Sequence, residues 1–172
     1  MPRSHSSMLR LSRAVIRALI LANLLLGAAI LALLIASLLA ETAVMTALGA
    51  SPANAPLVGG MRLIMMEGIC SAPLTHVVLT RLLAVLDTVG LGNPFQSANV
   101  GRLQTIAWAL LGLESLHLAA GAVAALSSTR AAPLDIDWSF SVTGWLAVLL
   151  LFVLARVFDE GARMNRDLQG TV

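Results

Sequence analysis

The sequence has no lysine and no tyrosine, and it has one cysteine among 172 residues. That single cysteine, Cys70, excludes an internal disulfide and any zinc or iron–sulfur site built from several cysteines of one chain. The sequence also lacks a glycine-rich phosphate loop, a nucleophile elbow and a His-Glu-x-x-His motif. We therefore expect neither an enzyme nor a resident cofactor or metal.

Charged residues are scarce as well, at 12% of the chain, whereas a soluble domain has about 25%. Hydrophobic residues make up 58%, the mean hydropathy is +0.89, and the apolar residues form four long runs. The first run is too long for the apolar region of a signal peptide and predicts an uncleaved anchor. We predict an all-α, integral membrane four-helix bundle that forms one membrane domain over residues 1–172, with spans at about 18–40, 63–86, 103–126 and 138–157.

The arginines predict the orientation of these spans, because basic residues concentrate in cytoplasmic segments. With the N-terminus inside, nine arginines fall in inner segments, and two, Arg62 and Arg130, fall in outer ones. We expect both termini to be cytoplasmic. The tail, residues 158–172, is predicted to extend the last span as a short cytoplasmic helix, because Asp159 and Arg163 are four residues apart and can pair along one side.

Two of the segments that join these spans differ in composition. The connector, residues 87–102, is rich in glycine, asparagine and proline, which break helices and favour turns. Ser97 or Asn99 is expected to cap the helix that follows it. The first loop, residues 42–60, carries no charge and is expected to be a short, flexible, non-cytoplasmic loop.

Four ionisable residues fall inside the predicted spans: Glu67, His76, Glu114 and His117. Such residues are costly in a bilayer and usually face the interior of the bundle. His76 and Glu114 both lie about 15 Å from the inner end of their spans, so we expect them to form one polar cluster with His117. Glu67 is expected nearer Arg62. The interpretations that stay open are a packing network, a proton- or ligand-sensing site, and a metal or haem site.

The connector and the tail also carry two recognisable motifs. The segments GNPFQSANVGRLQTIAW and RVFDEGARMNRDLQGTV resemble two signatures of a bacterial four-span family known as domain of unknown function 2975. The resemblance implies a membrane protein without an assigned activity, whose gene often neighbours one for a small helix-turn-helix regulator. The matching positions are Gly92, Pro94, Phe95, Asn99, Arg102, Leu103, Phe158, Gly161, Ala162, Arg163, Asp167, Leu168, Gly170, Thr171 and Val172.

Both motifs fall on the predicted cytoplasmic side. The first hypothesis is therefore a non-enzymatic membrane protein that binds or sequesters a cytosolic DNA-binding regulator, without contacting nucleic acid itself. Its predicted contacts are Phe95, Asn99, Arg102, Arg163 and Arg166. The same residues could instead pack on one another, with Arg102 reaching Asp159 or Asp167. The alternative function is a small transporter or a ligand- or proton-sensing bundle that uses the Glu/His residues. Self-association of the chain stays open.

Overall fold

The structure is a computed structural model that describes residues 3–49, 55–91, 95–127 and 141–169. Over these ranges it contains five helices and no strand, which confirms the all-α prediction. One helix is short and the other four are long. They are α1 (Arg3–Leu39), α2 (Glu41–Ala47), α3 (Ala55–Gly90), α4 (Ser97–Ser127) and α5 (Val142–Gln169).

The four long helices each hold a stretch long and apolar enough to cross a membrane, at Met8–Leu39, Leu57–Gly90, Ser97–Val123 and Val142–Met164. An apolar helix of about 20 residues spans the hydrocarbon of a bilayer. Large apolar side chains stay exposed along these helices, for example Leu25, Leu149 and Leu150, and in water they would form an extended hydrophobic surface. Together these features identify a membrane protein whose helices contact lipid.

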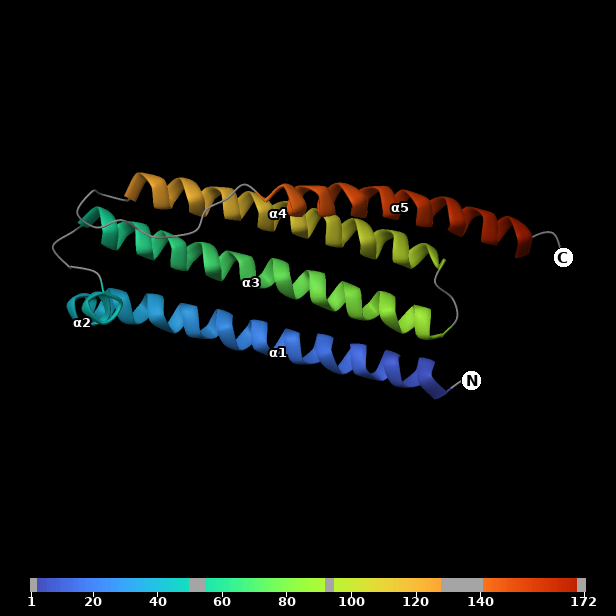
Figure 1. Cartoon of the computed structure of the whole chain (residues 1–172), viewed down its shortest axis with the longest axis horizontal. Coiled ribbons are helices and arrows are strands. Elements are labelled where there is room, and N and C mark those ends of the chain that lie inside the picture. Colours follow the sequence, from blue (N-terminus) through green and yellow to red (C-terminus); the bar gives the residue numbers. More distant parts are fainter. Residues whose placement is uncertain (1–2, 50–54, 92–94, 128–140, 170–172) are drawn as a thin grey trace.

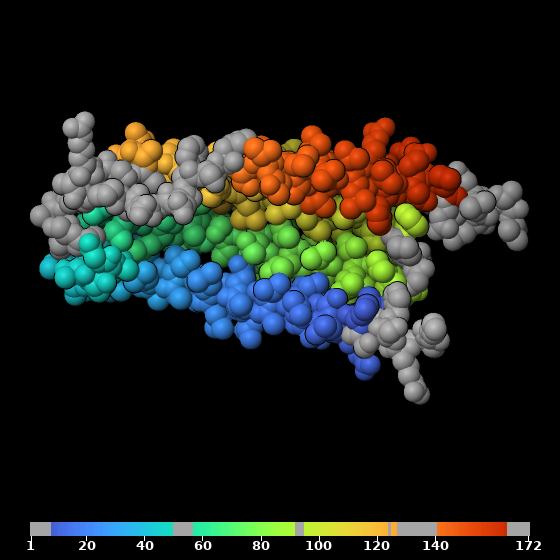
Figure 2. Space-filling view, viewed as in Figure 1, coloured from blue at the N-terminus to red at the C-terminus, as the bar shows by residue number. Residues whose placement is uncertain are grey.

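The helices pack in the order in which they occur in the chain. Antiparallel neighbours contact one another, α1 with α3, α3 with α4 and α4 with α5 (Figure 1). In the space-filling view α1 forms one edge of the molecule and α5 lies on the opposite side of α3 (Figure 2). The closed bundle that we expected is not confirmed, because across the described residues α1 makes no more than marginal contact with α4 or α5.

The two ends of this row differ. One end, which we name the connector end, holds the start of α1, the turn between α3 and α4 and the end of α5 (Figure 1). The other end, the α2 end, holds α2 and the start of α3. Met45 of α2 is fully buried there against Leu57 and Val58 of α3. The start of α1 and the end of α5 therefore lie on the same side as the connector.

Small residues allow the helices to approach closely. A Cβ atom at Gly27 of α1 would lie 3.1 Å from Cβ of Ala72 in α3. One at Gly112 of α4 would lie 3.1 Å from Cδ1 of Leu74. Tight packing around small residues is a main source of helix association in lipid, where no hydrophobic force acts between helices. These glycines therefore mark the closest α1–α3 and α3–α4 contacts.

The structure corrects several predicted boundaries. The first loop was expected to be irregular over residues 42–60, but Glu41–Ala47 forms α2 and α3 begins at Ala55. α5 begins at Val142, where Ser141 Oγ accepts a hydrogen bond from the N–H of Gly144 at 3.0 Å, an N-terminal cap that we did not predict. Asn99 does not cap α4, because it lies inside that helix. The helical tail is confirmed, since α5 continues to Gln169.

The glycine contacts generate the first prediction. Gly112→Leu should weaken the α3–α4 interface by about 1–3 kcal/mol, because the new side chain must displace Leu74. The measurement is thermal unfolding of the detergent-purified protein. The matched control is Gly101→Leu in the same helix, where nothing lies within 4 Å of the added Cβ atom. Equal effects of the two substitutions would contradict this packing.

Candidate functional site

A buried polar network joins α3 to α4 at the connector end. Asn99 Nδ2 donates a hydrogen bond of 2.7 Å to Thr88 Oγ1 of α3. Asn99 Oδ1 accepts one of 2.7 Å from Arg102 Nη1, which also donates to the backbone carbonyl of Ala84 at 3.2 Å. Asn99 has no exposed surface and Thr88 is buried. An amide in such a place needs partners, because an unsatisfied buried polar group costs about 1–3 kcal/mol.

This network changes the interpretation of two residues expected to contact a partner. Asn99 is enclosed by the chain itself, so its side chain is not available to another protein in this structure. Arg102 turns toward α3, whereas the packing alternative had it reach Asp159 or Asp167. Asp159 instead accepts a 3.0 Å contact from Arg163 one turn along α5. The side chains of Asp167 and Arg166 lie outside the described residues.

An aromatic contact joins the connector to α5. The rings of Phe95 and Phe158 have centroids 5.3 Å apart and are tilted by 43°. The Phe95 ring also lies over Gly161, where a Cβ atom would come within 2.9 Å of Cδ1. Any larger residue at Gly161 would push the ring away. The two recognisable motifs, one in the connector and one in the tail, are therefore in direct contact.

A salt bridge extends these contacts to α1. Arg13 Nε lies 2.7 Å from Asp87 Oδ1 of α3. Both side chains are part-exposed, so the pair contributes at most about 1 kcal/mol on its own. Its position matters more than its energy, because it completes a series of contacts running from α1 through α3 and α4 to α5. The connector end is thus a single connected surface.

Part of this end remains open. Phe95 is 44% exposed although it packs on Gly161, and the side chain of Arg163 is 62% exposed. Val157 and Met164 are also exposed and lie seven residues apart, hence on one face of α5. The name tail face is used below for four exposed residues around the end of α5: Phe95, Val157, Arg163 and Met164. Arg163 follows Gly161 by two residues, so it lies on the opposite side of the helix from Phe95. The four residues combine apolar surface with one cation.

The intramembrane ionisable residues do not gather as predicted. His76 of α3 lines a groove against α1, and Glu114 of α4 lies against Gly144 of α5. His117 of α4 lies near enough to Glu67 of α3 to influence it electrostatically, and Arg62 bonds to Ser37 and Glu41. Successive residues of a helix point about 100° apart around its axis. The prediction from sequence compared only the depths of these residues in the membrane and did not include their directions. Among the described residues no three His, Cys, Asp or Glu side chains could share a metal ion.

Glu114 occupies an unusual position. Its carboxyl group lies where a Cβ atom at Gly144 would be, so only glycine leaves room for it. Gly144 is in the first turn of α5, where N–H groups have no helical partner and the helix dipole favours an acid. The start of α5 is therefore flanked by the cap from Ser141 and by the carboxyl group of α4.

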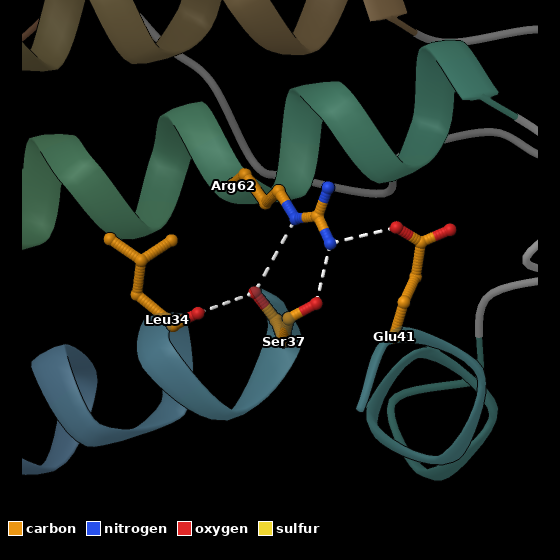
Figure 3. Close-up of polar contacts among 4 residues, drawn as sticks. All are labelled: Leu34, Ser37, Glu41 and Arg62. Atoms are coloured by element: carbon orange, nitrogen blue, oxygen red, sulfur yellow. Dashed lines mark hydrogen bonds and ion pairs between the residues drawn. The ribbon is translucent and has the colours of Figure 1, made fainter. Parts of the chain in front are cut away.

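Arg62 forms a comparable junction at the α2 end (Figure 3). Its Nη2 donates to the backbone carbonyl of Ser37 and to Glu41 Oε2, the latter at 2.8 Å, while Nε reaches Ser37 Oγ at 3.4 Å. Ser37 lies in the last turn of α1, whose final carbonyls have no helical donor. The guanidinium group of Arg62 in α3 thus hydrogen-bonds to both the end of α1 and the start of α2. This contact was not predicted, because spacing alone does not show which helix end an arginine reaches.

The connector network generates the second prediction. Asn99→Leu should lower the free energy of unfolding by about 2–3 kcal/mol, because Thr88 and Arg102 lose their partner. Arg102→Ala should cost about as much, and the double variant should cost less than the sum of the two, as expected for residues of one network. Chemical unfolding in detergent measures this. Strict additivity would show that the two side chains act independently.

Comparison with known proteins agrees with the two motifs at this end. A family described as "Protein of unknown function (DUF2975)" matches residues 50–172, which include α3, α4, α5 and both motifs. No curated protein and no solved structure matches the chain. With the family match covering well over half of its length, this chain belongs to the DUF2975 family.

Proposed function

We propose that this protein is a non-enzymatic protein of the bacterial inner membrane that binds a small cytosolic DNA-binding regulator at its connector end. The connector end faces the cytoplasm in this proposal, as does each terminus. The distribution of arginine supports that orientation, because basic residues concentrate on the cytoplasmic side. Among the arginines whose side chains are described, only Arg62 lies toward the α2 end. The regulator is of the helix-turn-helix class, as the family resemblance implies.

The observation that carries the proposal is the projection of α5. Phe95, just before α4, lies beside Gly161, so the stretch from Ala162 to Gln169 extends past the start of α4. At 1.5 Å per residue this is a projection of about 12 Å (Figure 1). Across the described residues it extends farther than the end of α3 or the start of α1 (Figure 1). A helix that leaves its neighbours in this way offers a face to a soluble protein.

The tail face suits such a partner. Met164 and Phe95 supply exposed apolar surface, and Arg163 supplies a guanidinium that can bind a carboxylate. Interfaces are enriched in aromatic residues, methionine and arginine at their centres. Asn99 and Arg102 take a supporting role, because they hold the connector that carries Phe95. Binding there would hold a regulator at the membrane and away from DNA.

Co-purification tests this proposal. The solubilised protein should retain the helix-turn-helix regulator encoded beside its gene, and Met164→Asp should reduce the amount retained at least fivefold, because it places an uncompensated charge on the tail face. Arg163→Ala should reduce it less. Arg81→Ala is the matched control, an exposed arginine of α3 outside the tail face, and it should leave retention unchanged.

Two outcomes would overturn the docking proposal. One is equal retention of the regulator by the parent protein and by the Met164→Asp and Arg163→Ala variants. The other is labelling from the wrong compartment. In a Cys70→Ala background, a cysteine introduced at Gln96 of the connector should react with a membrane-impermeant thiol reagent only from the cytoplasmic side. Reaction from the periplasm would place the tail face outside the cell.

A second candidate function is a proton-responsive or transporting bundle, and the electrostatic influence of His117 on Glu67 favours it. A carboxyl and an imidazole on adjacent spans can exchange a proton within the bilayer. Protein in vesicles that enclose a pH-sensitive dye should then pass protons under an imposed potential, and Glu67→Gln should abolish the flux. The Glu41→Gln variant, changed outside the spans, serves as control. Flux that is absent in the parent protein, or unchanged in Glu67→Gln, removes this candidate.

A further inference from the structure

A groove of about 450 Å³ lies between α1 and α3, within the membrane-spanning part of both helices. Leu24 and Leu31 of α1 are exposed at its border, so it opens toward lipid. Its volume is within the range of small-molecule sites, about 300–1,000 Å³. The lining residues are Asn23, Leu24, Gly27, Ala28, Leu31, Ile69, Ala72, Pro73, His76 and Val77.

The polar groups of the groove are gathered at one end. Asn23 Nδ2 donates to the backbone carbonyl of Ala72 at 2.9 Å, which places Asn23 beside the helical turn that ends at His76. At the other end, the contact of Ile30 with Gly68 places Leu31 beside Ile69. The groove therefore has the polarity of an amphiphile, with a polar head at Asn23 and His76 and an apolar tail toward Leu31.

His76 has hydrogen-bonding capacity that the chain does not use. Its Nδ1 atom is enclosed by the protein and has no hydrogen-bond partner among the described residues, so the imidazole ring must turn for this nitrogen to reach a ligand in the groove. Asn23 has a second amide hydrogen besides the one given to Ala72, because an amide nitrogen carries two. The two side chains face the groove from opposite walls. A carbonyl oxygen, with two lone pairs, can accept from both.

The absence of charged residues in the groove and its depth in the membrane restrict the class of ligand that it can bind. None of the residues that line the groove carries a formal charge, which disfavours a phosphate or a carboxylate head. His76 lies close to the middle of the Leu57–Gly90 span, within about 4 Å along the helix axis. The hydrocarbon is about 30 Å thick, so the ester carbonyls of phospholipids lie roughly 15 Å away from that level. The ligand must carry an uncharged carbonyl into the centre of the bilayer.

We infer that the α1–α3 groove binds a membrane quinone. The quinone carbonyl accepts hydrogen bonds from His76 and Asn23, and the isoprenoid or alkyl tail runs toward Leu31 and Ile69. The small side chain of Ala28 leaves room for a flat ring. This site is independent of the tail face, because it lies on α1 and α3 and the tail face belongs to the connector and α5.

Thermal unfolding of the detergent-purified protein tests the inference. The probe is a fully substituted benzoquinone with a decyl chain, chosen because a ring without free positions cannot add the thiol of Cys70. A ligand that binds the folded state raises the unfolding temperature by an amount that grows with the ratio of its free concentration to its dissociation constant. The quinone should raise that temperature. Decylbenzene, which has the same tail and ring without the carbonyls, should not.

Two variants test the hydrogen bond to the quinone head and the space in the groove separately. His76→Leu should weaken quinone binding about tenfold, the effect of losing one hydrogen bond of about 1.4 kcal/mol. Ala28→Phe should block binding by filling the groove. Its matched control is Ala22→Phe, an exposed alanine of the same helix that does not line the groove, and it should bind like the parent.

Three results would overturn the inference. They are no stabilisation of the parent protein by the quinone, equal stabilisation by decylbenzene, and equal quinone affinity in His76→Leu. The second result would show that the groove accepts any apolar chain, including the acyl chain of a lipid. If His76→Leu does not fold, the comparison of Ala28→Phe with Ala22→Phe decides the outcome. None of these measurements depends on the regulator, so they can fail without affecting the docking proposal.

Discussion

Hydrocarbon offers no hydrogen bonds, and this constraint explains where the polar contacts of the protein lie. Each polar side chain within a span must find its partner on its own or an adjacent helix. Asn23 meets this requirement with the backbone of α3, and Thr80 and Ser115 meet it with carbonyls of their own helices. The stronger polar junctions are near the two ends, where Arg62 joins α1, α2 and α3, and Arg102 joins α3 to α4.

These junctions compensate for a weakness of the architecture. Helices arranged in a row bury little surface, and few side chains of the described residues are fully enclosed. In lipid, apolar exposure costs nothing, so the row is held by close approach at glycines and by hydrogen bonds. The Asn99 network and the Phe95–Phe158 contact secure the connector end. The projecting end of α5 can therefore be presented in one orientation.

The same packing explains why the ionisable residues separate. Two helices packed side by side share one line of contact, and residues on other faces meet other neighbours. Glu114 faces α5, His76 faces α1, and Glu67 of α3 is influenced electrostatically by His117 of α4. A closed bundle would bring several of these residues to one axis. When the helices form a row, each ionisable residue has its own surroundings, so the groove beside His76 is separate from Glu67 and His117.

The sequence by itself determined the membrane class, the four spans, the helical tail and the family, because apolar runs, arginine placement and two local motifs are all contiguous in the chain. Only the tertiary structure decided which helix faces meet. The rotation of each helix about its axis placed Asn99 inside, turned Arg102 away from Asp159, set Glu114 against Gly144 and opened the groove beside His76. Such rotations depend on contacts between residues far apart in the chain, and hydrophobic spans with weak periodicity do not encode them locally.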